Sequence, residues 1–355
     1  MPIGLDDVVA AETALSHVDG AAGRLVIRDR PLGTLAGHVR FEAVVHLLLD
    51  GLVDDLPDLT SLPVQLGEAR AAVFDVAASL LPALAGLPVY DAMRAAIALQ
   101  PDASDSAAAL RLIAAPAVLL PALIRQGRGE PPVAPDAGRG HAEDMVRMLG
   151  ADPATAPALD TYMVTVCDHG LNASTFAARV VASTQAPLGS AVLAGLGALK
   201  GPLHGGAPGP IIAMLDAIAT AGDARTWLRQ EVGRGERLMG FGHRIYHTRD
   251  PRADALKAAV AALPHTAGRL AFAETVEREA LAVLAAHRPG RVLQTNVEFY
   301  TALLLEAIGF PPDSFTGVFA AGRAAGWVAH AREQALFGRL IRPQSRYLSH
   351  QERAA

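Results

Sequence analysis

The sequence is poor in cysteine and has no recognisable export signal. Its 355 residues include one cysteine, Cys167, so no disulfide can form within the chain. This usage fits a reducing compartment, and we expect a cytoplasmic protein. The N-terminal residues lack the basic segment and apolar run of a signal peptide. The longest apolar stretch, 112–124, is too short to span a bilayer and contains two prolines. It predicts a buried core helix or a pair of helices, and no membrane association.

Aromatic and charged residues are also scarce. Aromatics make up 5% of the sequence and charged residues 19%, against 51% apolar residues. A core must then be built from Ala, Leu and Val, which favours closely packed helices over sheets. The net charge of -5 argues against nucleic-acid binding, which needs a basic surface. An apolar composition without a membrane span indicates that some apolar surface is buried between subunits.

Several catalytic signatures are missing. The sequence has no His-Glu-x-x-His motif and no Cys/His cluster, so no metal site is predicted. Gly240-x-Gly242 lacks the third glycine and the preceding strand of a dinucleotide site. Neither a Gly-x-x-x-x-Gly-Lys-Ser/Thr phosphate loop nor a Gly-x-Ser-x-Gly nucleophile elbow occurs.

Apolar residues recur at helical spacing through most of the chain, which predicts a mainly α fold. A short β excursion is expected at 20–30, and an irregular basic tail at 340–355. The predicted helices span 8–16, 41–49, 68–81, 89–99, 104–113, 141–149, 158–166, 174–184, 190–199, 208–220, 224–232, 251–263, 273–288, 297–308 and 314–336.

The stretch from Gly240 to Arg252 combines glycines, a histidine and an arginine at a predicted helix start. Gly240 and Gly242 lack a Cβ, which lets the backbone beside His243 approach a ligand closely. Asp250 followed by proline is a helix-start signal. It places Arg252 in the first turn, where the helix dipole disfavours a cation. Arg252 should therefore face an anion, either a neighbouring carboxylate or a substrate.

Three further segments hold a functional group at a glycine break or a helix start. They are Asp168-His169-Gly170-Leu171-Asn172, Gly201-Pro202-Leu203-His204-Gly205-Gly206-Ala207 and Thr295-Asn296-Val297-Glu298-Phe299-Tyr300. Taken singly, each has an ordinary structural explanation, such as a helix cap or a favourable charge in a first turn. Arg323 is harder to explain, because its apolar neighbours predict a buried face and a buried guanidinium needs an anionic partner. Arg342 could be a surface charge.

Together these segments resemble citrate synthase. The matching motifs are Asp-His-Gly-Leu-Asn-Ala-Ser-Thr-Phe-Ala-Ala-Arg-Val at 168–180, Gly-Pro-Leu-His-Gly-Gly-Ala at 201–207, Met-Gly-Phe-Gly-His-Arg with Asp-Pro-Arg-Ala at 239–253, Asn-Val-Glu-Phe-Tyr at 296–300, Gly-Arg-Ala-Ala-Gly-Trp at 322–327 and Arg-Pro at 342–343. They follow the family's order from about residue 4 to about residue 347. One motif alone would be weak evidence, whereas six together are specific. The length resembles that of the shorter bacterial members.

The resemblance implies that an acyl-CoA is joined to oxaloacetate and that the thioester is then hydrolysed. Glu298 matches the base that removes the proton beside the thioester. His204 matches the hydrogen-bond donor to the enol or enolate oxygen, and His243 matches the acid that protonates the alkoxide formed from the ketone. No metal and no bound cofactor are expected, since the coenzyme A thioester is a substrate.

Substrate binding and assembly also follow from the resemblance. Arg252, Arg323 and Arg342 match the family's substrate arginines, whose planar forks suit the two carboxylates of oxaloacetate. His169 matches a further substrate contact. In the family the last arginine comes from the other subunit, so a homodimer is implied in which Arg342 reaches the neighbouring active site. The turn that holds the adenine end of coenzyme A is matched by Leu238, Met239, Gly240, Phe241 and Gly242.

The family's fold has two helical domains that close on oxaloacetate and exclude water. The resemblance places the large domain at 1–204 and 304–355 and the small domain at 205–303. Three positions depart from the family. Glu298 stands where most members have aspartate, and a misplacement of about 1 Å can lower a rate roughly a hundredfold. His247 stands where Arg or Lys is usual. Arg-Asp-Arg at 28–30 replaces Arg-Gly-aromatic.

Two other functions stay open beside citrate synthesis from acetyl-CoA. A 2-methylcitrate synthase acting on propionyl-CoA would share every residue named above, and a pocket separates one methylene by only about 1–3 kcal/mol. Because Glu298 has a longer side chain than the usual aspartate, the protein could also be a non-catalytic or impaired binder of acyl-CoA or oxaloacetate.

Overall fold

The computed structural model describes residues 8–205, 208–242, 245–246, 248–287, 290 and 293–349. Within them the chain is mainly α, as predicted, with 14 α-helices and one small sheet. The helices are α1 (Phe41–Leu49), α2 (Leu62–Ala78), α3 (Val89–Ala98), α4 (Ser106–Gly127), α5 (His141–Leu149), α6 (Ala156–Val166), α7 (Ala173–Ala182), α8 (Leu188–Leu199), α9 (Pro208–Ala221), α10 (Ala224–Gly233), α11 (Pro251–Ala261), α12 (Ala267–His287), α13 (Val297–Ile308) and α14 (Phe315–Phe337).

The predicted β excursion near the N-terminus is confirmed. It is an antiparallel sheet of β1 (Ser16–Asp19), β2 (Arg24–Ile27) and β3 (Arg30–Pro31), in that order. The turn between β2 and β3 places Arg28 at φ 45° and Asp29 at φ 62°. Aspartate tolerates this left-handed conformation better than most residues. The departure from Arg-Gly-aromatic therefore leaves the turn in place.

The helix predicted for residues 8–16 is wrong. No helix forms there, and the segment leads directly into β1. Two of its backbone groups bond to neighbouring helices: Ala14 N–H donates to Glu333 Oε1 at 2.8 Å, and the Glu12 carbonyl accepts from Arg179 at 3.1 Å. Apolar residues at helical spacing do not make this segment a helix, because its backbone groups form hydrogen bonds with side chains of α14 and α7.

The long apolar stretch forms one core helix rather than a pair. Helix α4 has 22 residues and passes through Pro116 and Pro121. Each proline removes one backbone donor, but burial of every side chain from 112 to 124 holds the helix against α2, α3, α5 and α14. Among the described helices α4 alone is long and apolar enough to cross a membrane, so the expectation that this stretch is too short is wrong. Its apolar window is 89% buried inside the protein.

Several helix starts lie earlier than predicted. Helix α2 begins at Leu62 instead of residue 68, with a proline in its first turn. Proline is compatible with a first turn because its missing N–H would have no helical partner there. Helix α12 begins at Ala267 instead of residue 273. The last helix and α1 match their predicted bounds to within one residue.

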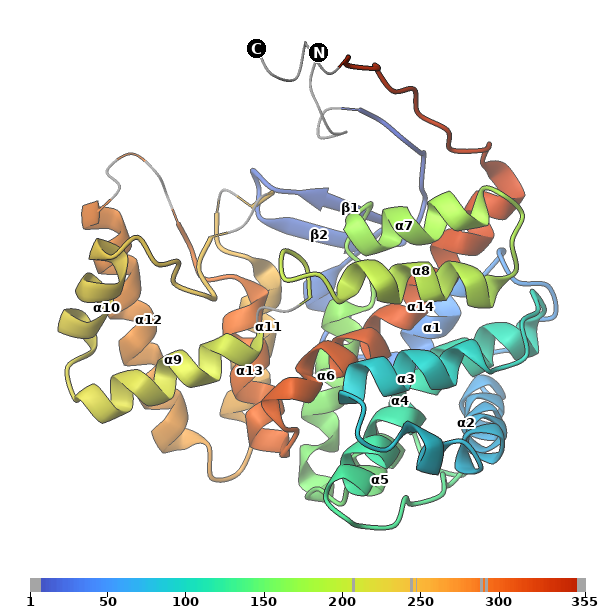
Figure 1. Ribbon diagram of the computed structural model, residues 1–355, viewed down its shortest axis with the longest axis horizontal. Helices are drawn as coiled ribbons and strands as arrows, with labels where there is room; N and C mark the ends of the chain where they lie inside the picture. Colours follow the sequence, from blue (N-terminus) through green and yellow to red (C-terminus); the bar gives the residue numbers. More distant parts are fainter. Residues whose placement is uncertain are drawn as a thin grey trace.

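The helices form two groups that meet along α6, α11 and α13 (Figure 1). Helices α9, α10 and α12 lie together on one side, and α1 to α5, α7, α8 and α14 lie on the other. Helix α11 packs on both α6 and α13, and α13 packs on α9. The domain bounds 1–204, 205–303 and 304–355 stay a prediction. The stretch after α14 runs away from the helices (Figure 1).

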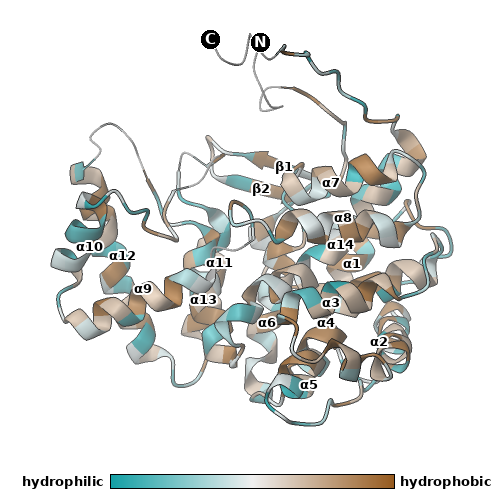
Figure 2. Cartoon of the chain, in the orientation of Figure 1, coloured by the Kyte–Doolittle hydropathy of each residue, from teal (hydrophilic) through white to brown (hydrophobic). Residues whose placement is uncertain are grey.

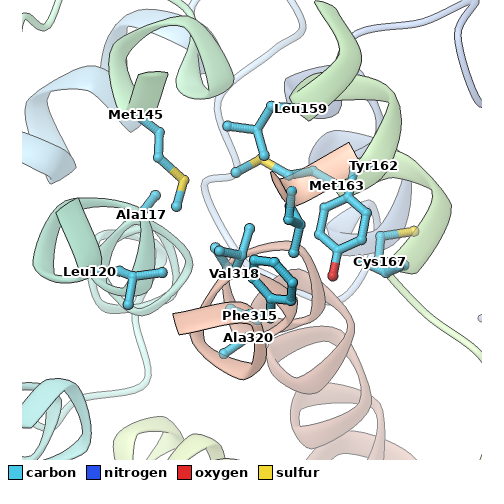
Figure 3. Close-up of a cluster of buried hydrophobic side chains, with 14 of the residues drawn as sticks. Ala117, Leu120, Met145, Leu159, Tyr162, Met163, Cys167, Phe315, Val318 and Ala320 are labelled. Atoms are coloured by element: carbon cyan, nitrogen blue, oxygen red, sulfur yellow. The ribbon is translucent and has the colours of Figure 1, made fainter. Parts of the chain in front are cut away.

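The core of the larger group is built where α4, α5, α6 and α14 meet. Figure 2 shows α4 as predominantly apolar, and this helix carries no charged residue between 112 and 124. Figure 3 shows its side chains pointing toward one another from several helices. The labelled members are Ala117, Leu120, Met145, Leu159, Tyr162, Met163, Cys167, Phe315, Val318 and Ala320. This core fixes α14, which carries Arg323, and the end of α6, which leads into the link that holds His169.

Candidate functional site

The glycine-rich segment 238–242 runs beside the start of α13. Gly242 N–H donates to the Gln294 carbonyl at 2.7 Å, and Asn296 N–H donates to the Gly240 carbonyl at 3.0 Å. The Asn296 side chain adds a bond to the Gly242 carbonyl at 2.9 Å. These backbone bonds form a short antiparallel pairing between the two segments. The segment predicted to hold coenzyme A is therefore attached to the turn that precedes Glu298.

A close approach requires glycine at position 240. Gly240 has φ +87°, and a Cβ there would lie 2.9 Å from the Phe299 side chain. Leu238 and Phe241 are buried, and Met239 is partly buried. The five residues predicted to contact coenzyme A thus form one continuous segment whose side chains mostly pack inward.

Glu298 lies in the first turn of α13. Asn296 caps this helix, since its side-chain oxygen accepts from the Glu298 N–H at 3.0 Å. Burial raises the pKa of Glu298 to about 7; Arg252 and Arg237 act to lower it and Asp250 acts to raise it. A carboxyl group with a pKa near neutrality is well suited to accept a proton at neutral pH.

Arg252 is held by the carboxylate that caps its own helix. Asp250 accepts from the Arg252 N–H at 3.1 Å and from its guanidinium at 3.0 Å and 2.8 Å, one bond to each oxygen. The same carboxylate accepts from the Val297 N–H at 3.2 Å, which joins the starts of α11 and α13. Burial opposes the charge, yet the ion pair with Asp250 raises the pKa of Arg252. Of the two anions that the sequence allowed, the neighbouring carboxylate is confirmed.

His204 follows α8 and is neutral in this environment. Burial, together with the charge of Arg323, lowers its pKa to about 4. Its Nε2 lies 2.7 Å from the Ser174 hydroxyl, which also accepts from the Trp327 indole N–H at 3.1 Å. The ring lies edge-on to Phe319, with centroids 6.3 Å apart. His204 is thus fixed from one side by α7 and α14.

Arg323 is fully buried on α14. Its Nε donates to the Val166 carbonyl at 2.6 Å, and its guanidinium lies 4.8 Å from the centre of the Phe319 ring. Burial lowers its pKa to about 10, with Asp168 acting to raise it and Arg252 to lower it. The group remains a cation at neutral pH. The anionic neighbour that burial required is Asp168, which is itself fully buried.

His169 lies in the link between α6 and α7 and is 5% exposed. Its Nε2 is 3.2 Å from the Tyr246 hydroxyl. The Tyr246 ring in turn lies 5.7 Å from the guanidinium of Arg252. Next to it, Gly170 N–H donates to the Ser16 hydroxyl at 2.8 Å, so the N-terminal sheet supports this link.

Five predicted residues therefore converge from distant parts of the chain. Arg252 lies close enough to Glu298 and to Arg323 to shift their pKa values, and Arg323 does the same for His204. His169 joins them through its tyrosine neighbour. His243 and His247, the remaining histidines of the prediction, lie outside the described residues.

Arg342 lies apart from this group within the chain. It is exposed in the stretch after α14. It lines a cavity of about 710 Å³ between that stretch, α7 and residues 8–14. Its predicted place in the active site of a second subunit stays a prediction.

Three residues around the site were not identified from the sequence as its members. Ser174 and Tyr246 contact predicted histidines, and Asp168 compensates the charge of Arg323. Asp168 directly precedes His169 in a quoted motif, which was an available signal. Ser174 lies in the same motif, and nothing local identified Tyr246. Among the described residues no group of three or more His, Cys, Asp or Glu side chains could hold a metal ion.

Comparison with known proteins gives one consistent family. Residues 4–344 match the family described as "Citrate synthase, C-terminal domain". The chain is 39% identical over 352 residues to "Putative citrate synthase 2" of Mycobacterium tuberculosis, covering 97% of this chain and 92% of the relative. It is 38% identical over 366 residues to the "2-methylcitrate synthase" of that organism, covering 99% and 91%. Its fold resembles a citrate synthase of Thermoplasma acidophilum in ternary complex with carboxymethyl coenzyme A and oxaloacetate, with a TM-score of 0.85, 27% identity and coverage of 97% and 95%.

Proposed function

Because the chain belongs to the citrate synthase family, acyltransferases that condense an acyl-CoA with oxaloacetate, we propose that it makes citrate from acetyl-CoA. The observation that carries this proposal is the convergence of Glu298, His204 and two buried arginines. The residues come from the ends of α8, α11 and α13 and from the middle of α14. A base, a neutral donor and fixed cations in one place are what this condensation needs.

In the proposed reaction Glu298 takes a proton from the methyl group of acetyl-CoA. Negative charge then develops on the thioester oxygen, and a preorganised donor stabilises it. A carboxylate is a weak base toward a carbon acid, so proton removal depends on that stabilisation. The pKa of Glu298, raised to about 7 by burial, makes it a stronger base than an exposed carboxylate.

The hydrogen bonds around Ser174 hold the ring of His204 in place. The Asn172 side-chain oxygen already accepts from the Ser174 and Thr175 N–H groups, both at 3.1 Å. The Trp327 indole can only donate to the Ser174 hydroxyl. The Ser174 hydroxyl donates to the same Asn172 oxygen at 2.8 Å, and its oxygen lies 2.7 Å from His204 Nε2. In the proposed reaction the neutral imidazole of His204 donates its N–H to the enolate oxygen.

Oxaloacetate would be bound by cations whose positions are already fixed. Arg252 and Arg323 are held by Asp250 and by the Val166 carbonyl respectively, so little ordering remains on binding. His169 would add a further contact. Protonation of the alkoxide by His243 belongs to the same proposal. The closed site would keep water out until condensation has occurred.

The proposal is tested by thiol release from acetyl-CoA with and without oxaloacetate. We expect release only when both substrates are present. Glu298→Gln should lower kcat by about 10²–10⁴-fold while oxaloacetate still binds, which is the range for a lost general base. Absence of oxaloacetate-dependent release by the folded protein would refute the proposal and leave a binding role. An unchanged kcat in Glu298→Gln would exclude this residue as the base.

A second candidate is 2-methylcitrate synthesis from propionyl-CoA. It is favoured by the 38% identity to a protein of that name. The two acyl groups differ by one methylene, which a pocket discriminates by about 10- to 200-fold at most. The ratio of kcat/KM for the two thioesters decides between them. We expect that ratio to favour acetyl-CoA, and a preference for propionyl-CoA would reverse the assignment.

A further inference from the structure

A buried carboxylate on α12 connects segments on two sides of the proposed base. Glu277 is 6% exposed. Its Oε1 accepts from the Thr295 hydroxyl at 2.6 Å and lies 3.2 Å from Arg249 Nη1, which donates to it. Its Oε2 accepts from the Tyr300 hydroxyl at 2.6 Å, and Lys257 Nζ lies 3.8 Å away. Both oxygens are therefore occupied by protein groups.

Two of these partners hold the start of α13. Thr295 directly precedes Asn296, whose side chain caps the helix at the Glu298 N–H. Tyr300 follows Glu298 by two residues on the same helix. A backbone fixed before and after one residue determines where the side chain of that residue begins. This matters for Glu298, because its extra methylene gives its carboxylate more positions than a shorter acid would have.

The third partner lies beside the start of α11. Arg249 directly precedes Asp250, which binds Arg252 through both carboxylate oxygens. Asp250 also accepts from the Val297 N–H on α13. The helix starts that carry the proposed base and a proposed substrate cation are therefore joined twice, once by Asp250 and once through Glu277 on α12.

We propose that Glu277 is a positioning residue for the condensation, fixing the proposed base Glu298 relative to Arg252 without touching the substrates. The inference rests on the proposed function. Its consequence is kinetic, because a displacement of about 1 Å at a reacting group can lower a rate roughly a hundredfold. In Glu277→Gln only one of the two side-chain oxygens remains, so the amide could not accept from partners on both sides as the carboxylate does.

The same helix offers a matched control. Glu274 lies about one turn before Glu277 and pairs with Lys257 at 2.9 Å. Its side chain is 42% exposed, and none of the other partners of Glu277 is bonded to it. Glu274→Gln therefore removes the same charge from α12 and leaves the anchoring hydrogen bonds intact.

The experiment compares Glu277→Gln, Glu274→Gln and the unaltered chain. Thiol release gives kcat and both KM values, calorimetry gives oxaloacetate affinity, and thermal unfolding gives stability. We expect Glu277→Gln to lower kcat by about 10- to 100-fold at a temperature where it is folded, with oxaloacetate affinity changed by less than about fivefold. Glu274→Gln should keep kcat within about twofold, as expected for an exposed ion pair.

Variants that each lack one hydrogen bond to Glu277 provide the test if Glu277→Gln does not fold. Thr295→Val and Tyr300→Phe each remove one hydroxyl donor to Glu277, and we expect kcat to fall by about 3- to 10-fold in each. Thr295→Ser retains the hydroxyl and should keep the unaltered kcat, which would tie the loss in Thr295→Val to the missing hydrogen bond.

The outcomes separate this inference from the proposed function. If the unaltered chain releases no thiol, the proposed function fails. If it is active and the folded Glu277→Gln variant, or both hydroxyl variants, keep the unaltered kcat, the inference is wrong. An equal loss of kcat in Glu274→Gln would also overturn it, because the effect would then come from helix charge and not from anchoring.

Discussion

Glu298 should set the acid limb of the pH–rate profile. Burial raises its pKa from 4.5 to about 7, and a base must be unprotonated to act. We therefore expect kcat/KM to fall about tenfold per pH unit below roughly pH 7. His204, whose pKa is lowered to about 4, should stay neutral through this range. Thiol-release rates measured from roughly pH 5 to roughly pH 9 give the profile.

The pH–rate measurement needs a folding control, which circular dichroism at each pH provides. A profile that stays flat down to pH 5 in folded protein would show that Glu298 is not the base or is not buried in solution.

The raised pKa of Glu298 affects folding stability in the opposite direction to activity, because the protonated form is the stabilised one. Because the folded state binds this proton more tightly, the stabilisation is complete below pH 4.5 and is lost as pH rises through about 7.

Individual site residues could be predicted only where a motif surrounds them. His204, Glu298 and Arg252 sit in short motifs at helix ends, and the structure brings them together. Their supporting partners were not predicted, because the pairs are separated by long stretches of chain. Ser174 meets His204 across 30 residues, and His169 meets Tyr246 across 77. Such pairs depend on how whole helices pack.

Helix ends were predicted well where the signal is local. Asp250 caps α11 as expected, Asn296 caps α13 at its predicted start, and Gly150 and Gly309 end α5 and α13 in the left-handed conformation. The predicted helices are wrong where tertiary contacts determine the backbone conformation. Residues 8–16 obtain hydrogen bonds from other helices, and α4 continues through two prolines because its surroundings are apolar.

The backbone of segment 238–242 should be essential for acyl-CoA binding. In Gly240→Ala the new Cβ would lie 2.9 Å from the Phe299 side chain, at a φ of +87° that alanine disfavours. The segment must then move away from α13. We expect KM for acetyl-CoA to rise about tenfold or more, and the free energy of unfolding to fall by about 1–3 kcal/mol. Steady-state kinetics and denaturant unfolding measure both.

Gly235 provides the control for this substitution. It has nearly the same φ, +86°, but no atom lies within 4 Å of a Cβ placed there. Gly235→Ala should therefore show the conformational strain alone, about 1 kcal/mol, with KM unchanged. Equal KM values in the two variants would mean that segment 238–242 does not bind the thioester.

At the scale of the whole molecule, one predicted substrate group stands outside the site. Arg342 is exposed in the stretch after α14, which runs away from the helices (Figure 1). Large apolar side chains are exposed in the same region, including Phe337 at 74% and Leu340 at 58%. Exposed apolar surface of this kind commonly marks a protein interface. Both features agree with the predicted homodimer in which Arg342 serves the neighbouring site.

Complementation between two inactive variants tests that arrangement. Glu298→Gln removes the base, and Arg342→Ala removes the proposed contribution to the other subunit. In a mixed dimer, the subunit with intact Glu298 would receive Arg342 from its partner, so one of two sites is complete. Random assembly of equal amounts should recover about a quarter of full activity. If Arg342 acted within its own chain, neither site of the mixed dimer would be complete and no activity would return. Each variant co-folded with itself gives the baseline, and mass determination of the mixture confirms that mixed dimers have formed.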